Sequence, residues 1–176
     1  MGFDARPLLL FAVPVGVSAF FRVAGVHFGL VSSIIFFAGF AGGLMLWKRR
    51  ELAALASGAP LPKWALFFLL AMALAVLEEN VNCPQDGCAL FPWTLAPFAL
   101  LFALLFAVVK LAKITDWKAA TALFGLMGVA VEFFAGAYSA SLLALPPLGL
   151  ALMVLFVFLT YSAIILLPAY AYLAGD

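Results

Sequence analysis

Charged side chains are scarce in this chain, and their scarcity excludes a water-soluble fold. Only 10% of its 176 residues are charged, whereas 68% are hydrophobic and the mean hydropathy is +1.25. A soluble domain contains about 25% charged residues, and a fold of this size would leave too much apolar surface in water. The formal net charge of +1 argues against nucleic acid as a partner, because nucleic-acid binding requires a dense basic surface. We therefore expect the lipid bilayer to be the solvent.

Histidine and cysteine are nearly absent, which excludes several kinds of cofactor site. His27 is the only histidine, so a haem held by two histidines and a histidine-rich zinc site are both excluded. Cys83 and Cys88 are the only cysteines, and their spacing differs from the Cys-x-x-Cys of redox motifs. We favour a structural disulfide in a loop on the outer face over two free thiols. The sequence predicts no metal and no cofactor.

Long apolar segments follow one another along the chain. A membrane-spanning helix requires about 20 mostly apolar residues. Segments of suitable length lie at 7–25, 28–47, 64–82, 90–111, 119–142 and 148–172. The first exceeds the apolar core of a signal peptide and five others follow it, so we expect it to be retained. The sequence predicts an all-α integral membrane protein, in which residues 1–176 form one bundle of about six transmembrane helices.

The basic residues indicate the orientation of these helices, because lysine and arginine are enriched at cytoplasmic ends. With the N-terminus inside, eight of the nine basic residues lie at inner ends, and only Arg22 lies toward the outside. Tryptophan prefers the headgroup level, and the four tryptophans fall at predicted helix ends: Trp47, Trp64, Trp93 and Trp117. We therefore expect a multi-pass protein of the cell membrane with both termini inside and a short interfacial helix at 48–56.

Glu132 is the clearest functional candidate, because it lies near the middle of the fifth segment. An ionised group at a membrane-helix centre costs roughly 2.5–3.5 kcal/mol, so we expect this carboxyl to face protein and to exchange a proton. Small residues that mark close helix packing share its face: Gly125, Gly128, Ala135, Gly136 and Ser139. The sixth segment runs antiparallel, and at the matching depth it carries Thr160, Tyr161 and Ser162 as hydrogen-bond donors. The alternative is a neutral acid that only holds two helices together.

A second polar group lies toward the outer end of the third segment. Glu78 and Glu79 are consecutive, and residues about 100° apart on a helix cannot share one face. Glu78 lies with Asn82 on a small and polar stripe that suits the bundle interior. Arg22 lies at a similar depth, so a structural ion pair with either glutamate is the alternative to an ion- or substrate-binding vestibule.

These residues suggest three classes of function. The first is a small transporter or ligand-binding membrane component, in which an outer vestibule leads to a protonatable Glu132 at the midplane. The second is a membrane-embedded enzyme acting on a lipid or isoprenoid, with Glu132 or Glu78 as general acid. The third is a structural subunit that assembles with further membrane subunits. We rank transport first, with the lipid bilayer and a small-molecule or lipid ligand as the expected partners.

Overall fold

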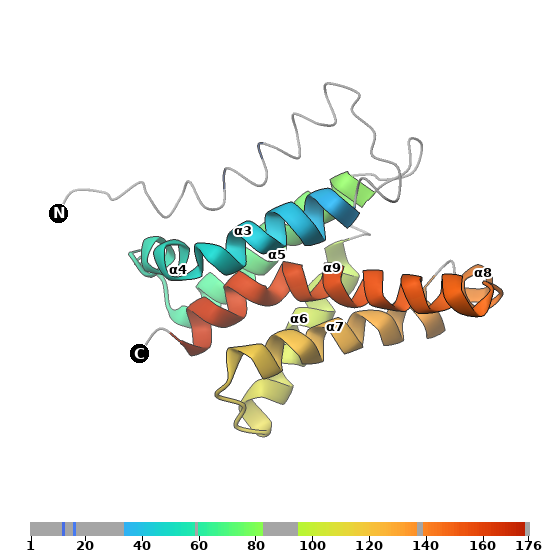
Figure 1. The fold of residues 1–176 in the computed structure, drawn as a ribbon. Coiled ribbons are helices and arrows are strands. Elements are labelled where there is room, and N and C mark those ends of the chain that lie inside the picture. The colour runs from blue at the N-terminus through green and yellow to red at the C-terminus, as the bar shows by residue number, and fades with distance from the viewer. Residues whose placement is uncertain are drawn as a thin grey trace.

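The computed structural model describes residues 34–58, 60–82, 95–136 and 139–174, together with the single positions Ala12 and Gly16. All regular secondary structure in these ranges is helical, which agrees with the predicted all-α class (Figure 1). The helices are η1 (Ile34–Ala41, a π-helix), α3 (Gly42–Trp47), α4 (Arg49–Ser57), α5 (Lys63–Asn82), α6 (Leu95–Leu111), α7 (Trp117–Phe134), α8 (Ser139–Leu143) and α9 (Pro147–Leu173).

Within the described ranges, three helices are long and apolar enough to cross a membrane. They cover Lys63–Val81, Trp117–Phe134 and Pro147–Leu173, whereas Ile35–Trp47 and Leu95–Leu111 are apolar but shorter. Large apolar side chains on these helices remain exposed, including Leu100, Leu148 and Phe134. Exposed apolar surface of this extent is typical of a lipid-facing protein. The structure thus supports association with a membrane.

The predicted segments can be compared with the helices only where the chain is described. α5 and α9 begin and end within one residue of the predicted segments 64–82 and 148–172. The predicted interfacial helix at 48–56 corresponds to α4. The predicted first span at 7–25, apart from two single positions, lies outside the described residues, as do Cys83 and Cys88.

The predicted fifth segment, 119–142, is wrong as one continuous helix. α7 ends at Phe134, and α8 starts only at Ser139. The helix ends because the amides of Ala135 and Gly136 both donate to the carbonyl of Val131, at 2.8 and 2.7 Å. Gly136 permits this turn, since a Cβ atom there would lie 2.8 Å from the Glu132 carbonyl oxygen.

α9 is the central helix of the bundle. It packs against α7, α5, α4, α3 and η1, and most extensively against α7. Every residue from Ala163 to Ala169 is buried, so neighbouring helices surround this half of α9. The opposite half carries exposed leucines such as Leu148 and Leu152. Figure 1 shows α4 beside the C-terminal end of α9, and α8 at its other end.

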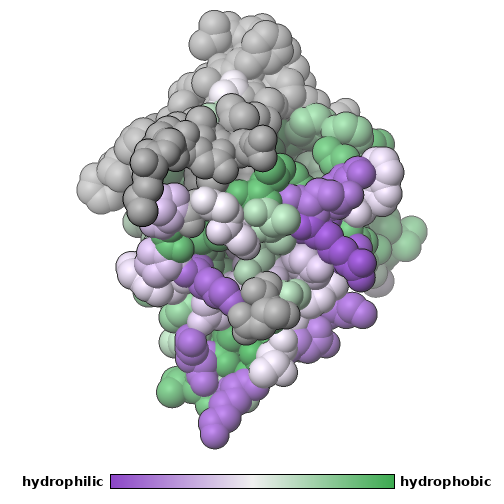
Figure 2. Space-filling view, turned by 90° about the vertical axis from the view of Figure 1, so that its left-hand side faces the viewer, coloured by the Kyte–Doolittle hydropathy of each residue, from purple (hydrophilic) through white to green (hydrophobic). Residues whose placement is uncertain are grey.

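One end of the bundle carries all the basic residues of the described ranges; we call it the basic end. α3, α6 and α9 finish there, and α5 and α7 begin there. Its basic residues are Lys48, Arg49, Arg50, Lys63, Lys110, Lys113 and Lys118, and its acidic residues are Glu51 and Asp116. Arg49 of α4 contacts the ends of two other helices: its guanidinium lies 5.9 Å from the Trp117 ring of α7 and 5.8 Å from the Tyr170 ring of α9. Figure 2 faces this end and shows the hydrophilic side chains gathered on it.

Candidate functional site

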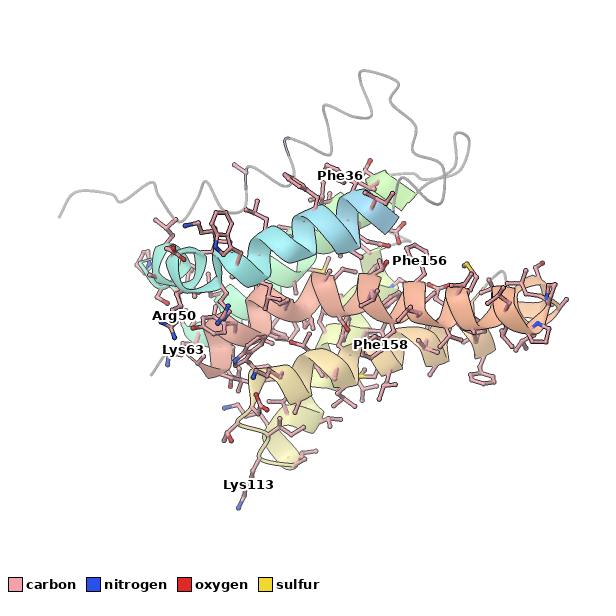
Figure 3. The ribbon with its side chains drawn as sticks, in the orientation of Figure 1. Phe36, Arg50, Lys63, Lys113, Phe156 and Phe158 are labelled. Atoms are coloured by element: carbon pink, nitrogen blue, oxygen red, sulfur yellow. The ribbon has the colours of Figure 1, made fainter. Side chains whose placement is uncertain are left out.

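The candidate site lies where α7 and α9 touch most closely. Gly125 and Gly128, both buried, form the contact surface of α7. A Cβ atom at Gly125 would lie 2.7 Å from the Phe158 ring, and one at Gly128 would overlap the Tyr161 ring. Figure 3 shows Phe158 between the two helices. Glycine at these positions therefore lets α9 bring Tyr161 directly against the α7 backbone, as expected for small residues in membrane helix packing.

Tyr161 connects α9 to the predicted acid. Its hydroxyl donates a hydrogen bond of 2.7 Å to Oε1 of Glu132, and its ring is 7% exposed. Two phenylalanines hold the ring in place: Phe98 of α6 at a centroid distance of 5.7 Å and Phe124 of α7 at 5.8 Å. The ring cannot swing away without losing these contacts, so the hydroxyl is fixed in position.

Glu132 lies in the last turn of α7, which differs from its predicted place in the middle of a longer helix. Its side chain is half-buried. The Oε2 atom approaches the turn after α7, and a Cβ atom added to Gly136 would lie 3.0 Å from it. One carboxyl oxygen thus accepts from α9 while the other lies against the end of α7. A change at this carboxyl acts on both the helix contact and the helix end.

The glutamates of α5 approach the same place. Glu78 is 6% exposed and Glu79 is half-buried, and both lie within electrostatic range of the Tyr161 hydroxyl. Glu79 is also within range of Glu132. Three helices therefore contribute to one group, which we call the acidic cluster: Glu78, Glu79, Glu132 and Tyr161. No set of three acidic, histidine or cysteine residues in the described ranges is arranged to hold a metal ion.

The other predicted donors do not reach Glu132. Ser162 Oγ donates to the Thr121 carbonyl oxygen at 3.4 Å, because Ser162 lies beside Gly125, nearer the start of α7. Thr160 is 2% exposed, and its hydroxyl has no hydrogen-bond partner among the described residues. Only Tyr161 combines the correct depth with a side chain long enough to reach the carboxyl. The predictions for Arg22 and the Asn82 side chain fall outside the described atoms.

Sequence reasoning missed the two rings that position Tyr161. Phe98 and Phe124 are ordinary apolar residues of their helices, and neither carries a spacing signal that connects it to Tyr161. Their role depends on which helix faces of α6 and α7 meet α9, which is a tertiary property. Comparison of the chain with protein-family models, curated protein sequences and solved structures finds no match.

Proposed function

We propose that this chain is a small membrane transporter or ligand-binding membrane protein in which proton exchange at Glu132 is coupled to the contact between α7 and α9. The observation that carries the proposal is the hydrogen bond between Tyr161 of α9 and Glu132 of α7, with Glu78 and Glu79 of α5 within electrostatic range of the same hydroxyl. Acidic groups within apolar helices are costly and are typical of proton and ion pathways.

The hydrogen bond supplies the coupling. An ionised carboxylate only accepts hydrogen bonds, whereas a protonated carboxyl carries one donor of its own. Protonation at Oε1 of Glu132 would turn the acceptor of the Tyr161 hydroxyl into a donor, and the hydroxyl, which can donate or accept, would rearrange so that it accepts from the carboxyl. Since Tyr161 belongs to α9 and Glu132 to the end of α7, this rearrangement changes a helix contact. A proton would thereby alter the packing of α7 against α9.

The proposed topology keeps about six spans, both termini inside and location in the cell membrane. Its support is the basic end, which carries seven basic residues and two acidic residues among the described positions. Positively charged ends of membrane helices favour the cytoplasm. α5 starts at the basic end and carries Glu78 and Glu79 near its other end. The following loop, with its proposed Cys83–Cys88 disulfide, would then lie on the outer face.

A structural role is the second candidate. The observation in its favour is the tight seating of the Tyr161 ring between Phe98, Phe124 and Gly128. A residue packed in this way can serve simply to lock three helices together. The two candidates differ in whether Glu132 changes its protonation state in the folded protein.

Infrared difference spectroscopy of the full chain in liposomes separates the candidates without a known substrate. We expect a carbonyl band of a protonated carboxylic acid that appears and disappears across a pH titration and that is missing in Glu132→Gln. Glu51→Gln, which removes an exposed carboxyl at the basic end, is the matched control and should keep the band. A Glu132→Gln protein that folds and retains the band would refute the proposal.

A further inference from the structure

A cleft opens at the basic end, away from the acidic cluster. Its volume is about 380 Å³, which lies within the usual range for small-ligand sites. Three lysines from three parts of the chain line it: Lys63 from the start of α5, Lys110 from the last turn of α6, and Lys113 from the following turn. Figure 3 labels Lys63 and Lys113 at this end. Thr115 adds a hydroxyl to the same wall.

The charged residues in the described lining of the cleft are all lysines, and no acidic residue belongs to that described lining. Lys110 Nζ lies 5.4 Å from the centre of the Tyr172 ring, a distance at which the ring attracts a cation. Because three lysines line it, the cleft is suited to an anion.

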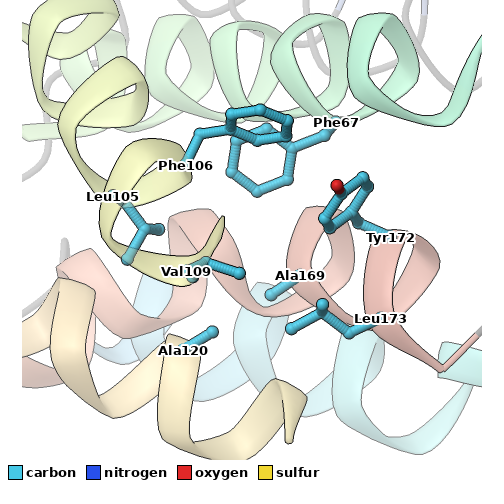
Figure 4. Close-up of a pocket in the computed structure, with 8 residues that line it drawn as sticks. All are labelled: Phe67, Leu105, Phe106, Val109, Ala120, Ala169, Tyr172 and Leu173. Atoms are coloured by element: carbon cyan, nitrogen blue, oxygen red, sulfur yellow. The ribbon is translucent and has the colours of Figure 1, made fainter. Parts of the chain in front are cut away.

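The remaining wall of the cleft is apolar. Val109, Tyr172 and Leu173 form part of it, and these three residues also line a small neighbouring cavity (Figure 4). That cavity is entirely apolar on its accessible surface and holds only about 10 Å³, so it has no room for a ligand chain. An apolar portion of a ligand would instead lie along the outer wall. The cleft offers cations on one side and hydrocarbon on the other.

The backbone of Lys113, which lines this cleft, is strained. Its φ is +53°, the left-handed conformation that usually carries glycine after a helix. The turn is closed by the Ile114 amide, which donates to the Val109 carbonyl at 2.9 Å. A residue with a Cβ atom is strained in this conformation, and such positions cluster at functional sites. A lysine here, where glycine would fit with less strain, agrees with a use for its charge.

We propose that this cleft binds the phosphate of an anionic ligand, and that the ligand is a membrane phospholipid. Basic pockets between membrane helices bind anionic headgroups. The level of the cleft favours a lipid over a free phosphate, because exposed tryptophans lie at the same end: Trp47 at the close of α3 is 70% exposed and Trp64 at the start of α5 is 56% exposed. Exposed tryptophan marks the headgroup level. The lysines bind the phosphate, and the apolar wall contacts the first part of the acyl chains.

The test measures lipid affinity of the purified full chain in detergent by native mass spectrometry, with phosphatidylglycerol and phosphatidylcholine as the probes. The test variant combines Lys63→Gln, Lys110→Gln and Lys113→Gln. The matched control combines Lys48→Gln, Arg50→Gln and Lys118→Gln, which removes the same charge from the same end outside the cleft. A third variant replaces the cleft lysines by arginine and keeps the charge. A charged hydrogen bond between a lysine and the lipid phosphate contributes roughly a tenfold factor, so the test variant should lose on the order of a hundredfold or more in affinity for phosphatidylglycerol.

Native protein should prefer phosphatidylglycerol, and the control and arginine variants should keep that preference. Equal losses in test and control variants would overturn the proposal, because they would show general surface attraction. Unchanged affinity in a folded test variant would overturn it as well. Displacement of the lipid by millimolar inorganic phosphate would retain the anion site but refute the lipid as its ligand. The result is independent of the proton chemistry, since Glu132→Gln should leave lipid binding unchanged.

Discussion

Gly128→Ala tests the central contact of the structure most directly. A methyl group at position 128 would meet the Tyr161 ring, whose atoms are the three nearest to the added carbon. The ring cannot yield easily, because Phe98 and Phe124 flank it and its hydroxyl is bound to Glu132. The two helices must therefore separate, or the ring must leave its place.

Both responses destabilise the bundle. Overpacking of a close contact typically costs about 1–3 kcal/mol, and a lost hydrogen bond between membrane helices costs about 0.6 kcal/mol on average. We expect a loss in the free energy of unfolding of about 2–4 kcal/mol when the two effects combine. Gly149→Ala is the matched control, because its added carbon would lie at ordinary contact distances of 3.7 Å or more. That variant should be no less stable than native, because alanine favours a helix over glycine by about 0.5–1 kcal/mol.

The assay measures the free energy of reversible unfolding in mixed micelles, with the circular dichroism of the helices as the signal. A double-variant cycle identifies the cause: in a Tyr161→Ala background, Gly128→Ala should lose most of its effect. If the Gly128→Ala variant had the same free energy of unfolding as native protein, the packing argument would be refuted. So would an equally large loss in the Tyr161→Ala background, because the clash would then lie elsewhere.

Further expectations follow from single contacts. Tyr161→Phe should lower the free energy of unfolding by about 1 kcal/mol, and should have no effect in a Glu132→Ala background; equal losses in both would remove the hydrogen bond as the cause. Lys113→Gly should be more stable than Lys113→Ala by about 1 kcal/mol, since only glycine relieves the left-handed strain. Equal melting temperatures of the two variants would contradict the left-handed turn at Lys113. A backbone hydrogen bond and Lys48 lower the pKa of Glu51, so its stabilising effect is present above the ordinary carboxyl pKa and disappears as the pH falls through the lowered value. An NMR titration should show this pKa rising toward its ordinary value in Lys48→Gln, and an unchanged value would refute the pairing.

The sequence was sufficient for the helical class, because a bilayer demands long apolar helices and leaves that demand visible in composition. The start of α5 and both ends of α9 could be placed to within one residue, since Pro60 and Pro62 precede the one helix, Pro146 and Pro147 open the other, and polar residues end the apolar runs. The end of α7 could not be placed from the sequence. Its apolar run continues past Phe134, and the helix stops because of local hydrogen bonding at Ala135 and Gly136.

Composition and charge alone determined that this chain is helical, apolar and basic at certain helix ends, because those properties are carried by each segment separately. Only the tertiary structure decided that Tyr161, and neither Thr160 nor Ser162, reaches Glu132. It also decided that Glu78 and Glu79 join the same cluster, and that Lys63, Lys110 and Lys113 line one cleft. These groupings depend on which faces of separate helices meet, and the distance between residues in space is not encoded in their distance along the chain.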